Sequence, residues 1–78
     1  MIVDDDIFVL EVNKYLVSTQ GLKVKTESDS RVALQRVITA GNSIDLILLD
    51  YKMPHINGLE FTIQISILIL KINLFLND

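Results

Sequence analysis

The stretch that decides the fold is DLILLDYKMP, which occupies residues 45–54. Its first half is an unbroken apolar run that starts after Asp45 and stops at Asp50. An apolar run of this length, bounded by charged residues, is typical of a strand that is buried on both faces, as in a parallel sheet. Residues 51–58 contain a proline and an Asn-Gly step, which predict a loop. The stretch therefore predicts a central parallel strand that ends in an aspartate.

Upstream of this strand, residues 7–19 carry a helical pattern. Four apolar residues recur at the i, i+4, i+7 and i+8 positions of one predicted face, namely Phe8, Val12, Tyr15 and Leu16. The pattern assigns Tyr15 to core or boundary packing. The acidic residues 4–6 precede the helix, where side-chain oxygens cap free N–H groups and favour the positive end of the helix dipole. Gly21 is the predicted stop signal of this helix.

The remaining upstream segments alternate between strand and helix patterns. Residues 2–3 look like the end of a buried strand, and residues 22–26 alternate apolar side chains with lysines, which predicts an edge strand. Residues 31–40 predict a helix that ends at residues 41–42. Its apolar stripe consists of Ala33, Leu34, Val37 and Ile38. The order strand, helix, strand, helix, strand predicts an α/β architecture with right-handed crossovers.

The sequence after the loop is apolar and rich in isoleucine. Residues 59–61 are able to open a third helix, but residues 63–76 alternate at first and favour a strand. The apolar segment 61–76 is shorter than the roughly twenty residues of a membrane helix, so no membrane span is expected. No basic segment precedes an apolar stretch at the start of the chain, so no signal peptide is expected either. A cytoplasmic protein is the resulting expectation.

Composition excludes several classes of protein. The chain of 78 residues holds one domain at most, and half of its residues are apolar, which argues against disorder. The absence of cysteine excludes disulfides and thiolate metal sites, and a single histidine excludes multi-histidine zinc sites. The net charge of -3 and the lack of a basic patch argue against direct nucleic-acid binding.

The acidic residues suggest a specific chemistry. Ligand sites of parallel α/β sheets lie beyond the carboxyl ends of the strands, where Asp4 and Asp5 follow the first strand and Asp50 ends the third. If these strands are neighbours, three mutually repelling carboxylates converge. Mg²⁺ is the natural counter-charge because it prefers oxygen ligands and completes its octahedron with water and phosphate oxygens. A carboxylate beside such a cation is able to attack phosphorus.

Three segments in this order and spacing resemble the receiver domain of response regulators and hybrid histidine kinases: IVDDD at 2–6, DLILLDYKMP at 45–54 and GLEF at 58–61. The resemblance covers residues 2–61. It implies a flavodoxin-like (CheY-like) α/β fold, a parallel sheet of strand order 2-1-3-4-5 with flanking helices. About three of the five strands are recognisable, so the predicted fold is incomplete.

The resemblance also implies roles for individual residues. Asp4 and Asp5 would hold Mg²⁺, Asp50 would be both a metal ligand and the phospho-acceptor, and Lys52 would supply its backbone carbonyl to the metal. Pro54 and Gly58 would shape the loop, and Ala33 would be a small packing residue of the second helix. The phosphoryl donor would be a histidine kinase or a histidine phosphotransfer protein. The chain would be a phosphorelay switch without enzymatic turnover of its own, and its oligomeric state is left open.

Other features depart from the family pattern. The resemblance implies a later strand that ends in Ser or Thr and another that ends in Lys, and neither residue can be placed. Thr62 and Ser66 follow Gly58 too closely to leave room for a third helix, and the match stops after residue 61. The sequence is therefore expected to be a C-terminally truncated or altered receiver, with residues 1–61 as its N-terminal part and 62–78 as an unmatched apolar tail.

Two alternative functions stay open. One is a receiver remnant that keeps the acidic pocket but does not signal, because it lacks the Thr and Lys switch residues. The other is a phosphatase of the haloacid-dehalogenase type, since residues 4–6 contain Asp-x-Asp. A P-loop NTPase is excluded because the Gly-rich Lys-Ser/Thr loop is missing. His55 has no partner motif and is interpreted as an ordinary loop residue.

Overall fold

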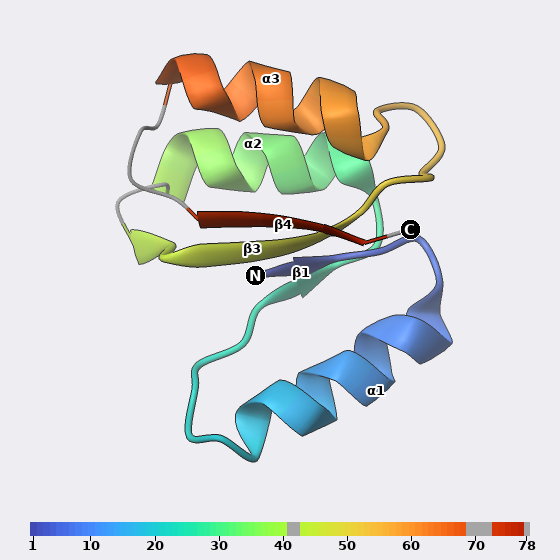
Figure 1. Cartoon of the computed structure of the whole chain (residues 1–78), viewed down its shortest axis with the longest axis vertical. Coiled ribbons are helices and arrows are strands. Elements are labelled where there is room, and N and C mark those ends of the chain that lie inside the picture. Colours follow the sequence, from blue (N-terminus) through green and yellow to red (C-terminus); the bar gives the residue numbers. More distant parts are fainter. Residues whose placement is uncertain (41–42, 69–72, 78) are drawn as a thin grey trace.

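The computed structural model describes residues 1–40, 43–68 and 73–77. Four strands form one sheet: β1 (Ile2–Val3), β2 (Thr26–Glu27), β3 (Leu46–Asp50) and β4 (Asn73–Asn77). Three helices alternate with them: α1 (Ile7–Ser18), α2 (Ser30–Ala40) and α3 (Gly58–Leu68). All strand pairs are parallel, and the order across the sheet is β2-β1-β3-β4. Figure 1 shows α2 and α3 on one face of the sheet and α1 on the other.

The shortness of β1 explains the shortness of β2. β2 lies at the edge of the sheet and pairs only with β1, through Ile2 opposite Thr26 and Val3 opposite Glu27. An edge strand has no second partner, so its ladder extends only as far as its neighbour does. The predicted strand over residues 22–26 is therefore wrong in its bounds, and Leu22 is 58% exposed. The prediction of an edge strand is confirmed.

β3 is buried on one face only, which corrects the prediction of burial on both. Ile47 and Leu49 are fully buried, whereas Leu46 is exposed and Leu48 is partly exposed. The buried side chains belong to the core that also includes residues of α2 and α3. On the opposite face of the sheet, α1 packs chiefly against β1 and β2 and leaves β3 less covered. The number of helices on each face therefore sets the burial of the strand.

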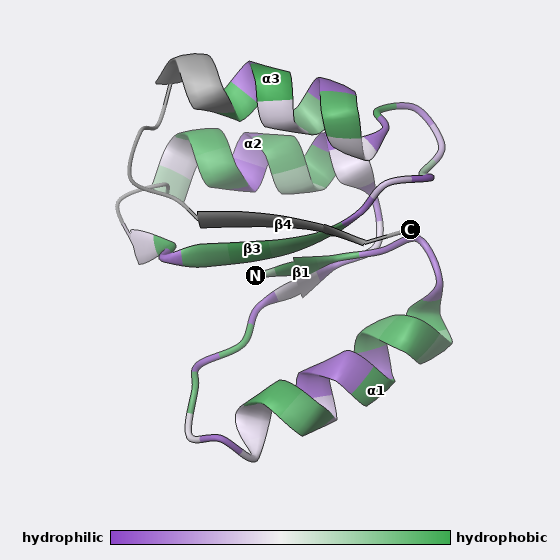
Figure 2. Cartoon of the chain, in the orientation of Figure 1, coloured by the Kyte–Doolittle hydropathy of each residue, from purple (hydrophilic) through white to green (hydrophobic). Residues whose placement is uncertain are grey.

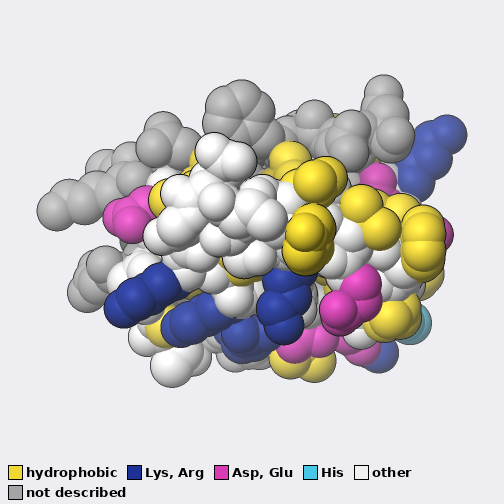
Figure 3. Space-filling model, turned by 90° about the horizontal axis from the view of Figure 1, so that it is seen from below, with side chains coloured by type: hydrophobic (Ala, Val, Ile, Leu, Met, Phe, Trp, Pro, Cys, Tyr) yellow, Lys and Arg dark blue, Asp and Glu magenta, His cyan; other side chains and the backbone are white. Residues whose placement is uncertain are grey.

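α1 begins where the sequence predicted, but it buries a different face. The Asp6 carboxylate caps the helix by accepting hydrogen bonds from the backbone N–H groups of Phe8 (2.9 Å) and Val9 (3.2 Å). Leu10 is the buried residue of the helix, whereas Phe8 is 76% and Tyr15 is 68% exposed. The assignment of Tyr15 to core or boundary packing is therefore wrong. Hydrophobic residues lie along the whole helix (Figure 2), and hydrophobic side chains reach the surface on this side (Figure 3).

α2 matches its prediction closely. Ala33, Leu34 and Val37 are buried as expected, and Ile38 at the margin of the stripe is 44% exposed. The helix begins at Ser30, one residue before the predicted start. Its predicted end at residues 41–42 lies outside the described residues.

The segment after Gly58 is helical, which confirms that a third helix opens there and corrects the prediction of a strand from residue 63. Thr62 and Ser66 lie within this helix, so neither ends a strand, as expected. Asn57 and Glu60 start α3 with reciprocal hydrogen bonds, each side chain accepting from the other's backbone N–H (2.9 and 3.1 Å). Phe61 and Ile65, four residues apart on one face, are buried against the sheet and α2. Further along, β4 bears out the predicted strand over part of its length. The proposed division at residues 61 and 62 stays a prediction, and α3 runs through that point.

Candidate metal centre

Three carboxylates converge at the carboxyl ends of two neighbouring strands. β1 and β3 pair with Val3 opposite Leu49, so the residues that follow these two positions are Asp4 and Asp50. One carboxylate oxygen from each of Asp4, Asp5 and Asp50 lies within 4.8 Å of the others. Asp4 and Asp50 are partly buried and Asp5 is exposed. The sheet register thus brings together the three acidic residues that the sequence analysis singled out.

The third acidic residue of the DDD run has a separate task. Asp6 caps α1, and its own backbone N–H donates to the Asp4 carboxylate at 2.9 Å. This hydrogen bond restrains the Asp4 carboxylate. The residues of the run therefore differ in role. Asp6 caps the helix, while Asp4 and Asp5 lie close to Asp50.

The surroundings of Asp50 disfavour its charged form. Partial burial is the largest cause that raises its pKa above the ordinary value of 3.8, and the negative charges of Asp4 and Asp5 raise the pKa further. The backbone N–H groups of Lys52 and Tyr51 oppose this rise by hydrogen bonding to the carboxylate. Among the described residues, no ion pair neutralises the three carboxylates. The site therefore carries excess negative charge that a cation would relieve.

This electrostatic penalty predicts a pH dependence for the metal-free chain. Because the folded-state pKa of Asp50 is raised, the folded state binds more protons than the unfolded state between pH 3.8 and that raised pKa. The contribution of Asp50 to stability is thus full below pH 3.8 and is lost as the pH rises through the folded-state pKa. In EDTA, we expect the thermal midpoint of Asp50→Asn to exceed that of the natural chain by a margin that grows with pH. A margin that shrinks with rising pH would contradict the assignment.

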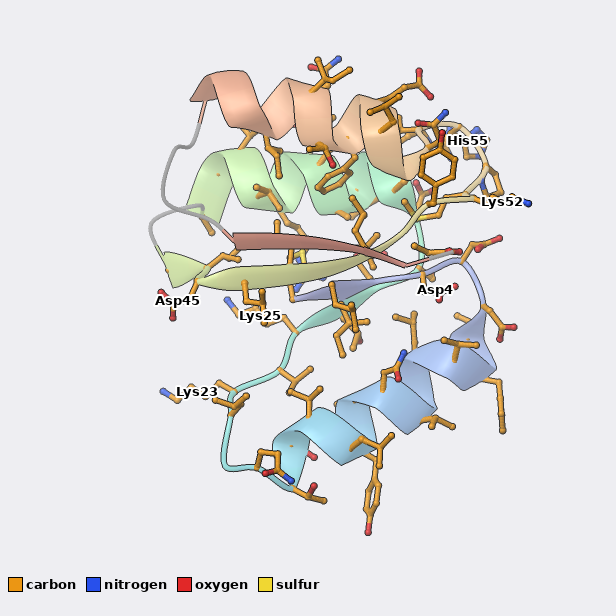
Figure 4. The ribbon with its side chains drawn as sticks, viewed as in Figure 1. Asp4, Lys23, Lys25, Asp45, Lys52 and His55 are labelled. Carbon is orange, nitrogen blue, oxygen red and sulfur yellow. The ribbon has the colours of Figure 1, made fainter. Side chains whose placement is uncertain are left out.

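The loop after β3 lies over the same end of the sheet. Figure 4 shows Lys52 and His55 on this loop, on the side of the molecule where Asp4 lies, whereas Lys23, Lys25 and Asp45 lie at the opposite end. The side chain of Lys52 is exposed and extends into solvent, so its ammonium is not directed at the carboxylates. Its role through the backbone carbonyl stays a prediction. His55 is an exposed loop residue, as expected.

The sheet register also identifies a residue that the sequence analysis did not place. β4 pairs with β3 so that Asn77 is the partner of Asp50. The backbone thus puts asparagine at the strand end where the resemblance implies Ser or Thr. The spacing of four residues between Phe61 and Ile65 indicates a helix that continues through residues 63–68. With that helix in place, the next strand falls near the end of the chain, and Asn77 becomes the candidate for its end.

The donor set fits a hard divalent cation. Carboxylate oxygens are ligands that Mg²⁺ prefers. Oxygens that coordinate Mg²⁺ lie about 2.0–2.1 Å from the metal, so two of them lie no more than about 4.2 Å apart. Oxygens of Asp4, Asp5 and Asp50 that lie within 4.8 Å need only small side-chain rotations to meet that requirement. Asp5 is exposed, which leaves room for water to complete the coordination.

A family model and two curated relatives point to the same protein family. A model of the response regulator receiver domain family matches residues 1–73. A putative two-component response regulator from Arabidopsis thaliana is 35% identical over 66 residues, which are 85% of this chain and 11% of that protein. A transcriptional regulatory protein from Haemophilus influenzae, a CpxR homolog, is 38% identical over 60 residues, which are 77% of this chain and 25% of that protein.

Solved structures show the same fold. A response regulator receiver domain protein from Clostridium thermocellum superposes with a TM-score of 0.92 at 28% identity, over 96% of this chain and 60% of that one. A chemotaxis protein from Vibrio cholerae gives 0.81 at 26% identity, and a response regulator receiver protein from Dyadobacter fermentans gives 0.79 at 34%. Each match covers 96% of this chain, which spans 62% and 63% of those two structures. The described helices include none that is long and apolar enough to cross a membrane.

Proposed function

Because the chain belongs to the response regulator receiver domain family of two-component signalling, we propose that Asp50 accepts a phosphoryl group in a phosphorelay. One observation carries the proposal: Asp50 ends β3 at the point where Asp4 and Asp5 bring two further carboxylates within 4.8 Å. The donor would be a phosphohistidine on a histidine kinase or on a histidine phosphotransfer protein. The identity of that partner follows from the family and is part of the proposal.

The transfer is a single displacement at phosphorus. A carboxylate oxygen of Asp50 forms a bond to phosphorus while the bond from phosphorus to the donor's imidazole nitrogen breaks, and the imidazole takes up a proton from water. Asp50 must be ionised for this attack. The carboxylate is partly buried at the strand end, and the backbone N–H groups of Lys52 and Tyr51 favour its charged form. Its location at the carboxyl end of β3, where it is only partly buried, leaves it accessible to the donor.

The negative charge of the site would otherwise repel the incoming phosphoryl group. Asp4, Asp5, Asp50 and the backbone carbonyl of Lys52 are the groups that would hold Mg²⁺. A bound Mg²⁺ would neutralise the carboxylates and the charge that develops on the transferred oxygens. The residues of the chain then have two tasks: Asp4 and Asp5 supply ligand charge, and Asp50 supplies both a ligand and the nucleophile.

The chain would act as a switch that is consumed and restored stoichiometrically, and not as an enzyme with turnover. A phosphatase of the haloacid-dehalogenase type would release phosphate repeatedly from a phosphomonoester. Incubation with p-nitrophenyl phosphate separates the two: the proposal expects no continuous release.

Asp5→Ala should weaken Mg²⁺ binding about tenfold or more, because it removes one of three carboxylate charges around the cation. Isothermal titration with Mg²⁺ measures the effect. Asp6→Ala is the matched control: it removes a carboxylate one residue away that caps α1, so it should lower the thermal midpoint and leave the Mg²⁺ affinity within about twofold. Equal losses of affinity in the two variants would contradict the metal role of Asp5.

A second candidate is supported by the end of β4. Asn77 is the register partner of Asp50, at the strand end where the resemblance implies a hydroxyl-bearing residue. A receiver with this change would accept a phosphoryl group without the conformational response that signalling needs. Amide NMR spectra before and after phosphorylation distinguish the cases. Shifts confined to the loops around Asp50 favour the non-signalling remnant, and shifts that spread along β4 favour a working switch.

A further inference from the structure

The loop after Asp50 contains a strained three-residue turn. The backbone N–H of Ile56 donates to the carbonyl of Pro54 at 2.9 Å, and the residue between them, His55, has a φ of 71°. This hydrogen bond across three residues with a positive central φ is the pattern of the γ-turn form that is rare and strained. A side chain with a Cβ atom disfavours this backbone region, so surrounding contacts must hold the turn.

One buried hydroxyl contacts both ends of this turn. Ser30, the first residue of α2, is 2% exposed and is the one buried polar residue among the residues whose burial is described. Its Oγ donates to the carbonyl of Pro54 at 3.0 Å and accepts from the backbone N–H of Ile56 at 3.2 Å. A serine hydroxyl has one donor and two acceptor positions, so it is able to serve both groups at once. Ser30 thus bridges the residues on either side of His55.

The rest of the loop transmits this restraint to Asp50. The backbone N–H of Gly58 donates to the carbonyl of Tyr51 at 2.8 Å and closes the loop at its base. Between that closure and the turn lie Lys52, whose backbone N–H is near enough to the Asp50 carboxylate to favour its charged form, and the buried Met53. The loop is therefore fixed at the base by its own backbone and at the tip by α2.

We infer that Ser30 is a positioning residue, which holds the strained turn at residues 54–56 and thereby fixes the loop that carries Lys52 beside Asp50. This inference rests on the proposed function, since the Lys52 backbone matters to metal binding and phosphoryl acceptance only if Asp50 has that role. Ser30, His55 and Asp5 also line one cleft of about 240 Å³, so a change in the turn alters the surroundings of Asp5.

Ser30→Ala tests the inference in the full chain. It removes both hydrogen bonds and should weaken Mg²⁺ binding about tenfold, the effect expected for groups that orient metal ligands without touching the metal. Ser28→Ala is the matched control, because Ser28 lines the same cleft but its hydroxyl makes no hydrogen bond to the turn, and its affinity should be unchanged. Both variants are titrated at a temperature where circular dichroism shows them folded. If Ser30→Ala unfolds, Ser30→Cys replaces it, because cysteine keeps the side-chain shape but its sulfur is only a weak hydrogen-bond donor and acceptor.

A second substitution isolates the strain. His55→Gly places a residue without Cβ at the positive φ, so the turn no longer needs to be held. In the His55→Gly background, the loss of affinity caused by Ser30→Ala should fall from about tenfold to less than about threefold, a coupling that the double-mutant cycle measures. Equal losses in the two backgrounds would overturn the inference, as would a Ser30→Ala variant with a lower thermal midpoint and unchanged Mg²⁺ affinity.

Hydrogen exchange separates this inference from the proposed function. The Ile56 amide is protected by its bonds to Ser30 and Pro54, so Ser30→Ala should increase its exchange rate at least tenfold, whether or not the chain binds Mg²⁺. If the natural chain fails to bind Mg²⁺ while Ser30→Ala still increases the exchange rate of the Ile56 amide, the proposed function is wrong, but Ser30 does restrain the turn. An unchanged Ile56 exchange rate refutes the hold itself.

Discussion

Asp50→Asn should abolish phosphoryl labelling. An amide nitrogen or oxygen at this position is a far weaker nucleophile than a carboxylate, and the change also removes one of the three negative charges that would bind the cation. The measurement is the intact mass of the purified chain after incubation with acetyl phosphate and Mg²⁺. The variant should show only the background seen without phosphodonor, whereas the natural chain should gain a single phosphoryl group.

Asp45→Asn is the control for this substitution. Asp45 precedes the same strand at its opposite end (Figure 4), so the chemical change is identical while the acidic site is untouched. Labelling of Asp45→Asn should equal that of the natural chain. Undiminished labelling of Asp50→Asn would show that another residue accepts the phosphoryl group, and Asp4 and Asp5 would then be the next positions to substitute.

Phe61→Ala should remove most or all of the stability of the fold. The Phe61 side chain is fully buried in the core shared by α3, α2 and β3, and truncating a buried phenylalanine typically costs about 3–5 kcal/mol. Native proteins have a free energy of unfolding of only about 0.05–0.15 kcal/mol per residue, so a chain of this size has little stability to lose. Urea denaturation followed by circular dichroism measures the loss.

Phe8→Ala provides the matched comparison for that loss. Phe8 is 76% exposed on α1, so the same truncation should change the free energy of unfolding by no more than about 0.5 kcal/mol. Similar losses at the two positions would contradict the packing of α3 on the sheet. They would also reopen the interpretation of the segment after Gly58 as a strand.

The convergence of Asp4, Asp5 and Asp50 could be predicted from the sequence, because it depends on strand order and on residues next to strand ends. Asp4 and Asp50 follow apolar runs whose parallel pairing places their ends together, and that inference requires no knowledge of side-chain packing. The capping role of Asp6 was equally accessible, since acidic residues before a helical pattern are common caps.

The predictions failed where tertiary packing chooses between two local patterns. Residues 63, 65 and 67 alternate as in a strand, yet the spacing of four between Phe61 and Ile65 is the one that packs, and Ile63 is 54% exposed. On α1, apolar residues lie on more than one side, so periodicity alone did not reveal that Leu10 faces the sheet. The role of Ser30 depends on contacts to residues 24 and 26 positions away, which no local pattern encodes.

The central claim is that Asp50 accepts a phosphoryl group with the help of a cation held by its acidic neighbours. The most direct test incubates the natural chain with acetyl phosphate across a Mg²⁺ titration, reads the intact mass and locates the modification by fragmentation. The account predicts one phosphoryl group, on Asp50, with a yield that rises with Mg²⁺ and disappears in EDTA. Labelling at another residue, or at Asp50 to the same extent in EDTA, would contradict it.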